Sequence, residues 1–531
     1  MSNGVTEEKW SGGRKATIIS GGIVGLAVFI AFLPSLHSGF VNWDDQQYVY
    51  ENPVIRNLDL NFLKTVFTTV LVYNWHPLTM LSYGIDYALW GLDPWGYHLE
   101  NIILHALNTA LVFLLVLRLS REAGKTNAIF AGCVAGFIFG VHPLHVESVS
   151  WVSERKDVLS AFFFLLAILS YLKYSSLRKS FSYAASLVFF TLALLSKPMA
   201  VTLPAALLIM EYGLGRLDPR SWESVKSRVI EKAPFFILSV LSSAITVWAQ
   251  NRQGALTPIE AYPLIDRLTV VVRAYVFYLY KFIAPVGLAP FYPLPGKSEF
   301  FGAGFFVSLA VFAAVTVFCV FSARRSRVIP AAWLYYVVTL LPVIGIIQVG
   351  NQFAADRYAY LPQLSLAVLA GLGAGRLFES PAKSTKTALV AALLLIAALL
   401  IVLTVRQEAV WADSITLWTR EIEAFPGKVP LAYNQRGYAY EKKGDFSAAL
   451  KDFNSAIAAN PAYTASYINR GIAHAELGMF DKSIEDFKKA ITLDPGKASA
   501  YYNLSRVYSK TGDTMEADFY RQKGDEAGEK K

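Results

Sequence analysis

Residues 387–405 read TALVAALLLIAALLIVLTV, a run that contains no charged side chain. A helix needs about 20 apolar residues to cross a bilayer, and somewhat shorter spans are tolerated. Ten other stretches of the chain are similarly apolar, so we predict an all-α fold: a polytopic membrane bundle of about eleven transmembrane helices. The predicted spans are roughly 17–36, 99–118, 128–141, 158–172, 182–196, 199–213, 233–250, 303–322, 328–347, 358–377 and 387–405.

The composition of the chain favours the same class. Of its 531 residues, 54% are hydrophobic and only 17% are charged, whereas a soluble domain carries about 25% charged residues. The net charge of +9 does not indicate nucleic-acid binding, because the basic residues gather in short loops between apolar segments. Such loops set the orientation of a membrane protein. Cys133 and Cys319 both lie inside apolar spans, which argues against a disulfide framework.

The basic loops assign the two sides of the membrane. Clusters at 118–125, 173–179, 216–232 and 324–327 alternate correctly with the spans if the N-terminus is cytoplasmic. The first span has basic residues before it and no small-residue cleavage site after it, so we interpret it as a retained signal anchor. Residues 266–284 are also apolar, but crossing there would place the 324–327 cluster outside. We therefore predict an amphipathic or re-entrant helix on the outer face.

The C-terminal part of the chain is a repeat array. Residues 436–439 read RGYA and residues 470–473 read RGIA, an offset of 34 residues. A period of 34 with small residues at helix crossings is the tetratricopeptide pattern, and such arrays form surfaces for peptides or partner proteins. We predict a transmembrane domain over 1–405, a linker helix over 406–429 and about three repeats over 430–531. The same offset relates Gly444 to Gly478, Phe446 to Phe480, Phe453 to Phe487, Ala456 to Ala490 and Pro461 to Pro495.

Two adjacent acids follow the first span. Residues 40–50 read FVNWDDQQYVY, which places Asp44 and Asp45 at the mouth of a membrane helix. Carboxylates in that position are costly to desolvate, so their presence predicts a functional role. A polar loop at a helix end is the alternative interpretation. Asp44 and Asp45 are the first candidates for a catalytic base.

The other unusual polar residues fall in segments that the predicted topology also places on the outer face. Carboxylates close to cations indicate an anionic lipid head group met by a general base, because Arg and Lys hold phosphate and a carboxylate accepts a hydroxyl proton. Besides the acid pair, these residues are His76, His98, His142, His145, Glu147, Glu154, Arg155, Lys156, Lys197, Asp356 and Arg357.

Each of these residues also has a structural interpretation. His142 and His145 flank a proline and are equally suited to ending a helix. Arg155 and Lys156 suit charges that reach for lipid head groups, and Arg357 suits an ion pair with its neighbour Asp356. No spacing of the HExxH type is present, so the sequence does not indicate a metal. The cofactor requirement stays open, including a divalent metal.

Four features in this order resemble a known family. An acid pair follows the first span; HPLHVESVSWVSERKDVLS occupies residues 142–160; LSKP occupies residues 195–198; and DRYAYLP occupies residues 356–362. Together with C-terminal tetratricopeptide repeats, they resemble the transmembrane-and-tetratricopeptide O-mannosyltransferases and their bacterial relatives in the GT-C glycosyltransferase superfamily. The resemblance covers nearly the whole chain.

The resemblance implies a reaction and assigns roles. Such enzymes move a sugar from a polyprenyl-phosphate donor to an acceptor hydroxyl outside the cytoplasm, with inversion. The base would be Asp44 or Asp45, and the donor phosphate would meet Arg357 or Lys197, with Arg155 next. The implied partners are the lipid donor, a protein or peptide acceptor held by the repeats, and membrane lipids, with no nucleic acid. A bacterial inner membrane is the implied location, with a cytoplasmic N-terminus and periplasmic repeats.

Two other function classes compete with a glycosyltransferase. A non-catalytic membrane scaffold would recruit partners through the repeats, but it would leave the outer-face charges unexplained. A transporter would place acids within spans near the bilayer midplane, whereas the acids here cluster at one interface.

Overall fold

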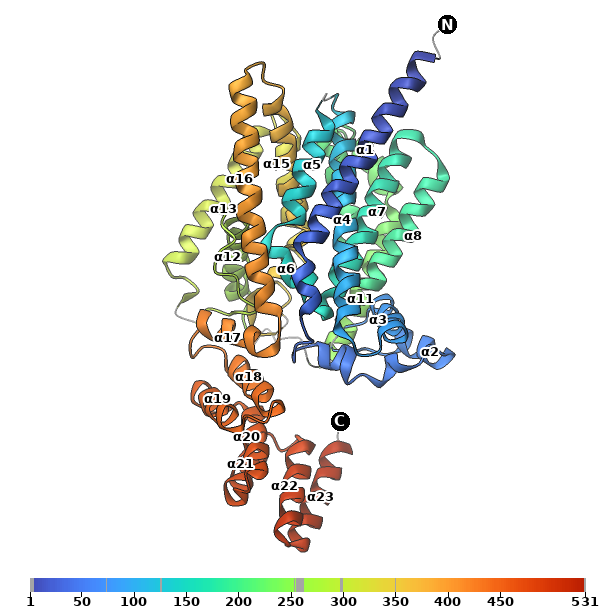
Figure 1. Cartoon of the computed structure of the whole chain (residues 1–531). Helices are drawn as coiled ribbons and strands as arrows, with labels where there is room; N and C mark the ends of the chain where they lie inside the picture. The colour runs from blue at the N-terminus through green and yellow to red at the C-terminus, as the bar shows by residue number, and fades with distance from the viewer. Residues whose placement is uncertain are drawn as a thin grey trace. The chain divides into compact units, whose positions relative to one another are not determined.

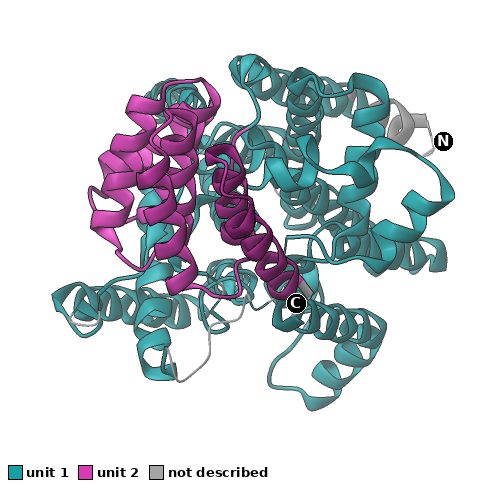
Figure 2. Ribbon diagram, turned by 90° about the horizontal axis from the view of Figure 1, so that it is seen from below, with its two compact units in different colours: residues 1–40, 44–412 teal, residues 41–43, 413–531 magenta. Residues whose placement is uncertain are grey.

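The computed structural model of the chain consists of two compact units (Figure 2). Unit 1 comprises residues 1–40 and 44–412, and unit 2 comprises residues 41–43 and 413–531. The structure describes residues 4–72, 74–124, 127–252, 254, 262–296, 299–348 and 350–529, with side chains from residue 13 to residue 528.

Unit 1 is helical, with most helices running side by side (Figure 1). Its helices are α1 (Gly4–Ala31), α2 (Leu60–Thr68), α3 (Pro77–Trp90), α4 (Pro94–Glu122), α5 (Ala128–Gly140), α6 (Val146–Ser150), α7 (Arg155–Leu177), α8 (Ser180–Ser196), α9 (Leu203–Gly213), α10 (Trp222–Glu231), α11 (Ala233–Arg252), α12 (Leu264–Ile283), α13 (Ala303–Ser322), α14 (Val328–Leu340), α15 (Gln363–Phe378) and α16 (Lys383–Glu408).

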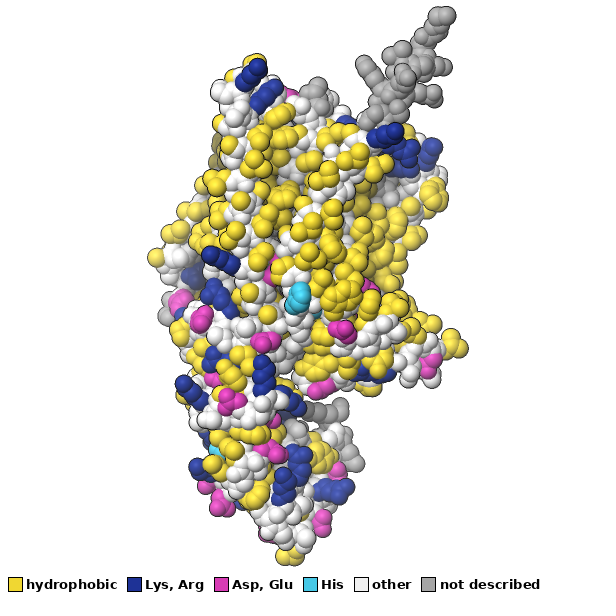
Figure 3. All heavy atoms as spheres, viewed as in Figure 1, with side chains coloured by type: hydrophobic (Ala, Val, Ile, Leu, Met, Phe, Trp, Pro, Cys, Tyr) yellow, Lys and Arg dark blue, Asp and Glu magenta, His cyan; other side chains and the backbone are white. Residues whose placement is uncertain are grey.

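The chain is a multi-pass membrane protein. Within the described residues, six helices are long and apolar enough to cross a bilayer: Gly13–Ala31, Pro94–Glu122, Val152–Leu177, Ala233–Arg252, Ala303–Ser322 and Lys383–Trp411. A seventh span results if the bent pair Ala128–Gly140 and Pro143–Ser150 is counted as one. Shorter apolar helices occupy Ser180–Ser196, Pro198–Gly213, Val328–Leu340 and Gln363–Phe378. Apolar side chains cover the visible face of these helices (Figure 3), as contact with lipid requires.

Helix α12 coincides with the segment predicted to be amphipathic. It is absent from the candidate spans found in the described chain because charges interrupt it. Two of these charges are buried: Arg267 is 5% exposed and Lys281 is 7% exposed. Arg267 donates to the backbone carbonyls of Tyr262 at 2.8 Å and Ile346 at 3.1 Å. These backbone oxygens therefore offset the free-energy cost of burying the Arg267 guanidinium.

Small residues allow the membrane helices to approach closely. A Cβ on Gly371 of α15 would lie 2.5 Å from the backbone oxygen of Ala131 on α5. A Cβ on Gly140 would overlap a methyl carbon of Val28 on α1. Helices in lipid associate through such van der Waals packing at small residues. This packing fixes the frame on which the polar loops are mounted.

Short elements connect the helices at the end of unit 1 where the polar residues gather. They are the 3-10 turns η1 (Leu33–His37), η3 (Pro53–Arg56), η4 (Pro143–His145), η5 (Val152–Glu154), η6 (Pro198–Thr202), η8 (Asp356–Ala359) and η9 (Ala409–Trp411), and the π-helical turn η2 (Gln46–Tyr50). Strands β1 (Tyr292–Pro293) and β2 (Gln352–Ala354) pair antiparallel, with Tyr292 opposite Ala354.

The break between α5 and α6 has a local cause. The two helical segments are bent by 54°. Pro143 begins the second segment and cannot donate a backbone hydrogen bond to the preceding helix. His142 has extended backbone, as expected before a proline. The bend turns residues 146–157 across the end of the bundle, where they meet the loop that carries Arg357.

Unit 2 is a stack of helix pairs. Its helices are α17 (Ser414–Ala424), α18 (Pro430–Lys442), α19 (Phe446–Ala459), α20 (Thr464–Glu476), α21 (Phe480–Leu493), α22 (Ala498–Thr511) and α23 (Thr514–Glu529). Residues 41–43 belong to this unit because Asn42 is held in it. The Asn42 backbone N–H donates to Ser414 Oγ at 2.9 Å, and Trp418 Nε1 donates to Asn42 Oδ1 at 2.7 Å.

The 34-residue period has a structural basis in unit 2. Arg436 pairs with Asp452 at 2.8 Å, and 34 residues later Arg470 pairs with Asp486 at 2.6 Å. A Cβ on Gly437 would lie 2.7 Å from the ring of Phe453, which explains the need for a small residue there. The third pair of helices lacks these residues, in keeping with a terminal unit that caps the stack.

Candidate functional site

The two adjacent aspartates of the first loop differ in their surroundings. Asp45 is 1% exposed. Its Oδ1 accepts the backbone N–H of Ser153 at 2.9 Å and the hydroxyl of the same serine. The side chain of Asp44 is 23% exposed, and its Oδ2 lies 3.8 Å from Lys156 Nζ. Asp45 therefore fastens the loop to η5, while Asp44 keeps access to an incoming molecule.

The acid pair is placed by the π-helical turn η2. The carbonyl of Asp44 accepts the backbone N–H groups of Gln47 at 3.0 Å and Tyr48 at 2.9 Å. Tyr48 and Val49 are fully buried and anchor this turn in the apolar cluster that includes Tyr83 and Tyr97. Single π-helical turns occur frequently at functional sites.

Glu154 joins three cations from three segments of the chain. Its carboxylate lies 3.1 Å from Lys156 Nζ, 3.1 Å from Lys197 Nζ and 3.4 Å from Arg357 Nε. Glu154 itself is 1% exposed. We call Asp44, Glu147, Glu154, Lys156, Asp157, Lys197 and Arg357 the charged cluster.

Glu147 and Asp157 orient two of these cations further. Arg357 forms an ion pair with Glu147, and its backbone N–H donates to Glu147 Oε2 at 3.0 Å. Lys197 Nζ lies 2.5 Å from Asp157 Oδ1, and Asp157 Oδ2 accepts the hydroxyl of Ser148 at 3.0 Å. The cations are thus partly buried and held by more than one carboxylate each. Such pairing offsets the cost of burying the charges.

Aromatic rings lie against the same cations. Lys156 Nζ is 5.1 Å from the ring centroid of Tyr48 and 5.8 Å from that of Trp151. The Arg357 guanidinium carbon is 5.5 Å from the Trp151 ring. Cation–π contacts of this kind favour the charged form of Lys and Arg. Trp151 stacks on Trp411 of η9, with ring centroids 5.3 Å apart. The turn that follows α16 therefore packs against the tryptophan that contacts both cations.

Titration properties follow from this environment. Burial raises the pKa of Asp44 above its usual value, and the charge of Lys156 partly opposes that shift. Burial, followed by the charge of Lys156, lowers the pKa of His76 to about 3, so this imidazole is neutral at physiological pH. His76 is 3% exposed, and neither ring nitrogen has a hydrogen-bond partner among the described residues. It offers one donor and one acceptor beside the charged cluster.

Asp356 and Arg357 are adjacent in the sequence but contact different residues. Asp356 is 2% exposed and accepts the hydroxyl of Tyr292 at 2.9 Å. Burial raises the pKa of Asp356 well above its usual value, and the charge of Glu147 adds to the shift. Arg357 faces Glu147 and Glu154 instead. The turn η8 separates the two side chains, and the Tyr292 contact secures it to strand β1.

Arg155 lies apart from the charged cluster. It is fully buried and pairs with Asp86 at 2.8 Å and with Glu100 at 2.9 Å. Its Nη2 also donates to the carbonyl of Tyr97 at 2.8 Å. This network joins α3, α4 and α7, so Arg155 has a structural position. Its neighbour Lys156 points to Asp44 because consecutive residues on a helix face different directions.

His142 and His145 also point into the protein. His142 Nε2 lies 3.0 Å from the carbonyl oxygen of Phe282, and His145 Nδ1 lies 2.8 Å from that of Phe139. The first contact ties the bend after α5 to α12, and the second ties the bend back to the end of α5 itself. In the described part of the chain, no three His, Cys, Asp or Glu side chains are grouped so that they could hold a metal ion.

The sequence does not identify Trp151 or Asp157 as members of the site. It places Glu154 on the outer face but assigns no role to it. Glu154 caps the start of α7 and Asp157 lies three residues later, in its first turn, so this spacing places both carboxylates on the same side. That spacing is the one sequence signal that could have predicted a binding position for the Lys197 ammonium group between two carboxylates.

Comparison with known proteins identifies the repeats first. The tetratricopeptide repeat family matches residues 430–463 and 464–497, and a further tetratricopeptide repeat family matches residues 487–519. The crystal structure of MamA protein is similar to part of the chain, with 29% identity over 22% of this chain and 63% of that chain and a TM-score of 0.21.

Most of the chain is similar to protein O-mannosyl-transferases. A Caenorhabditis elegans member is 24% identical over 457 residues, which cover 83% of this chain and 62% of that protein. Human TMTC1 is 22% identical over 74% of this chain and 49% of its own length. Drosophila melanogaster Tmtc2 is 33% identical over 37% of this chain and 22% of its own length.

These matches confirm the family resemblance given by the motifs. The chain is a distant homologue of the TMTC protein O-mannosyl-transferases, with broad coverage and with tetratricopeptide repeats. It spans between 12% and 62% of the length of the curated relatives that it matches.

Proposed function

We propose that this homologue of the TMTC protein O-mannosyl-transferases is a membrane glycosyltransferase. It moves a sugar from a polyprenyl-phosphate donor to an acceptor hydroxyl. The proposed sugar is mannose, and the proposed acceptor is a protein. The observation that carries the proposal is the approach of a partly exposed carboxylate, Asp44, to a cluster of three cations: Lys156, Lys197 and Arg357.

Asp44 is suited to the role of general base. The acceptor hydroxyl gives its proton to the Asp44 carboxylate as its oxygen attacks the anomeric carbon of the sugar. A raised pKa makes this carboxylate a better proton acceptor than an ordinary aspartate. Asp45 is assigned a positioning role, because its Oδ1 is occupied by Ser153.

The cations are suited to the leaving group. As the bond between the anomeric carbon and the phosphate oxygen breaks, its electron pair stays on the phosphate. Lys156, Lys197 and Arg357 stabilise that negative charge without reorganising, because carboxylates and aromatic rings already hold them. Attack from the side opposite the phosphate inverts the anomeric centre. His76 completes the donor site as a neutral hydrogen-bonding group.

The proposed arrangement in the membrane follows from the same assignment. Each of the eleven predicted apolar segments contains a helix, so we propose a GT-C-like bundle of about eleven spans in which the four shorter apolar helices also cross. The N-terminus is then cytoplasmic, and the charged cluster and the repeats are on the outer face of a bacterial inner membrane. We propose domains over 1–405 and 430–531 joined by a linker over 406–429, with the repeats presenting a protein acceptor.

The test is release of lipid phosphate. Purified full-length protein in vesicles is incubated with polyprenyl-phosphate mannose, with and without candidate acceptor polypeptides, and free polyprenyl phosphate and glycosylated product are measured. Product formation that depends on Lys156 and Arg357 supports the proposal. Absence of turnover with every polyprenyl-phosphate sugar, with partner binding by the repeats intact, would favour the scaffold instead.

A further inference from the structure

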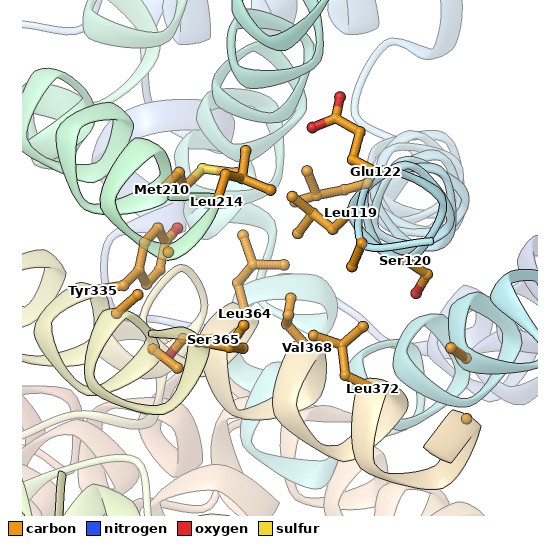
Figure 4. A pocket seen from close by; sticks show the side chains of 18 of the residues that line it. Leu119, Ser120, Glu122, Met210, Leu214, Tyr335, Leu364, Ser365, Val368 and Leu372 are labelled. Atoms are coloured by element: carbon orange, nitrogen blue, oxygen red, sulfur yellow. The ribbon is translucent and has the colours of Figure 1, made fainter. Parts of the chain in front are cut away.

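A second site lies in unit 1, away from the charged cluster. It is a cavity of about 210 Å³ between α4, α5, α9, α14 and α15 (Figure 4). Its walls are mainly apolar, with Leu119, Leu214, Leu364, Val368 and Leu372 around the space. An engineered apolar cavity of roughly 150 Å³ stays dry and takes up benzene. A void of this size and lining therefore suits hydrocarbon better than water.

The cavity lies toward the opposite end of the bundle from the charged cluster. On α4, Asn101 contacts Arg155, which lies between Glu154 and Lys156 of that cluster in the sequence, whereas Leu119 and Glu122 line the cavity. Eighteen residues of helix separate Asn101 from Leu119, roughly 27 Å at 1.5 Å per residue. The sugar-transfer site therefore does not account for the cavity.

Two hydroxyl groups in the cavity wall lack partners. Ser120 is 1% exposed and Tyr335 is 5% exposed, and both residues line the cavity. Neither hydroxyl has a hydrogen-bond partner within the described part of the chain. Buried hydroxyl groups are normally hydrogen-bonded, so each unpaired one needs an explanation. A ligand with acceptor oxygens beside a hydrocarbon chain would satisfy both.

The rim of the cavity lies among arginines. Glu122, Arg376 and Glu379 are at the rim, and Glu122 is already paired with Arg118 at 3.0 Å and Arg216 at 2.9 Å. The two arginines neutralise the Glu122 carboxylate, and Arg376 is the cation among the residues that line the cavity. Its positive charge complements an anionic head group.

We propose that the cavity binds an anionic glycerophospholipid. One acyl chain enters between α4, α9, α14 and α15, the ester oxygens accept hydrogen bonds from Ser120 and Tyr335, and the phosphate lies near Arg376. Isoprenoid phosphates share the charge and the hydrocarbon, but lack ester carbonyls. The two unpaired hydroxyl groups therefore favour the glycerophospholipid.

The experiment is native mass spectrometry of the full-length protein, delipidated and then incubated with phosphatidylglycerol, phosphatidylcholine or polyprenyl phosphate. We expect one phosphatidylglycerol to remain bound at collision energies that strip phosphatidylcholine. Val368→Trp, which fills the cavity, and Arg376→Gln, which removes the rim charge, should each reduce retention at least fivefold. The matched control Leu395→Trp places the same aromatic side chain on a face of α16 where Leu395 is 72% exposed, and should retain the lipid.

Two milder variants guard against misfolding. Tyr335→Phe and Ser120→Ala remove one hydroxyl each without adding volume, and they should lower phosphatidylglycerol retention more than that of polyprenyl phosphate. Equal retention of phosphatidylglycerol and phosphatidylcholine would overturn the proposal, as would preferential retention of polyprenyl phosphate or unchanged binding in Val368→Trp. None of these readouts depends on sugar transfer, so the proposed enzymatic function and the lipid site can fail separately.

Discussion

Replacement of one aspartate of the acid pair at a time separates catalysis from folding. Asp44→Asn keeps the shape of the side chain but removes the proton acceptor. Loss of a general base lowers rates by about 10²–10⁴-fold, so we expect a fall of that size in kcat for sugar transfer. The fold should be little affected, because Lys156 loses a partner at 3.8 Å but keeps Glu154 at 3.1 Å. A partly exposed ion pair is worth only about 0–1 kcal/mol.

Asp45→Asn is the matched control. The Asp45 carboxylate accepts two hydrogen bonds from Ser153. A hydrogen bond to a charged group is worth about 1.5–3 kcal/mol and a neutral one about 0.5–1.5 kcal/mol, so the loss over the two hydrogen bonds should be roughly 2–3 kcal/mol. We therefore expect a lower thermal midpoint in detergent and a smaller fall in kcat than for Asp44→Asn.

The assay compares initial rates of lipid-phosphate release with thermal unfolding of the same preparations. Donor affinity is measured separately, because exchanging the Asp44 carboxylate for a neutral amide should not weaken binding of an anionic donor. An Asp44→Asn protein that retains kcat within about threefold, beside an inactive but stable Asp45→Asn protein, would refute the assignment of the base.

Four further outcomes are expected. The acid limb of kcat/KM should lie above pH 3.8, the usual pKa of aspartate, because burial raises the pKa of Asp44 and the base must be deprotonated; a pH–rate profile that is unchanged in Asp44→Asn would contradict this. Arg357→Gln should lower kcat/KM about 10- to 100-fold by removing a charged contact worth about 1.5–3 kcal/mol, and Arg357→Lys should recover part of it in steady-state assays. Arg155→Met should destabilise the fold by about 3–5 kcal/mol by leaving Asp86 buried without its cation, as judged by the yield of monodisperse protein, whereas Arg178→Met, at a side chain that is 54% exposed, should not. Gly371→Ala should reduce the yield of folded protein because its Cβ would lie 2.5 Å from the Ala131 oxygen, while Gly373→Ala, which meets nothing within 4 Å, should be neutral; equal yields would count against close α5–α15 packing.

The proposed lipid site also bears on the proposed sugar transfer. Anionic lipid between α9, α14 and α15 would brace the helices that carry the loop of Arg357, since α15 begins six residues after that arginine. Sugar-transfer activity in detergent should therefore be compared with activity in phosphatidylglycerol vesicles, where the bracing lipid is present.

Much of the architecture is a direct consequence of local sequence. A run of apolar residues must form a helix in lipid, because every backbone polar group has to be satisfied within the segment. Each of the eleven apolar stretches therefore contains a helix, although the helix that begins at Val328 ends at Leu340 and the next begins only at Gln363. The 34-residue period likewise determines the repeats, because Gly437 and Gly471 each have to accommodate the phenylalanine 16 residues later. The motifs were sufficient to indicate the family.

The roles of the polar residues depend on the tertiary structure. Asp44 and Asp45 are adjacent and chemically identical. Ser153 donates to Asp45, which therefore holds the loop in place, whereas Asp44 stays partly exposed. Arg155 and Lys156 are equally adjacent, yet one is enclosed by Asp86 and Glu100 and the other faces Asp44. Pairing of buried charges is decided by segments that are distant in the chain, because burial is tolerated only where a counter-charge from another helix arrives. Local sequence specifies where a charge occurs, and the fold specifies which partner it meets.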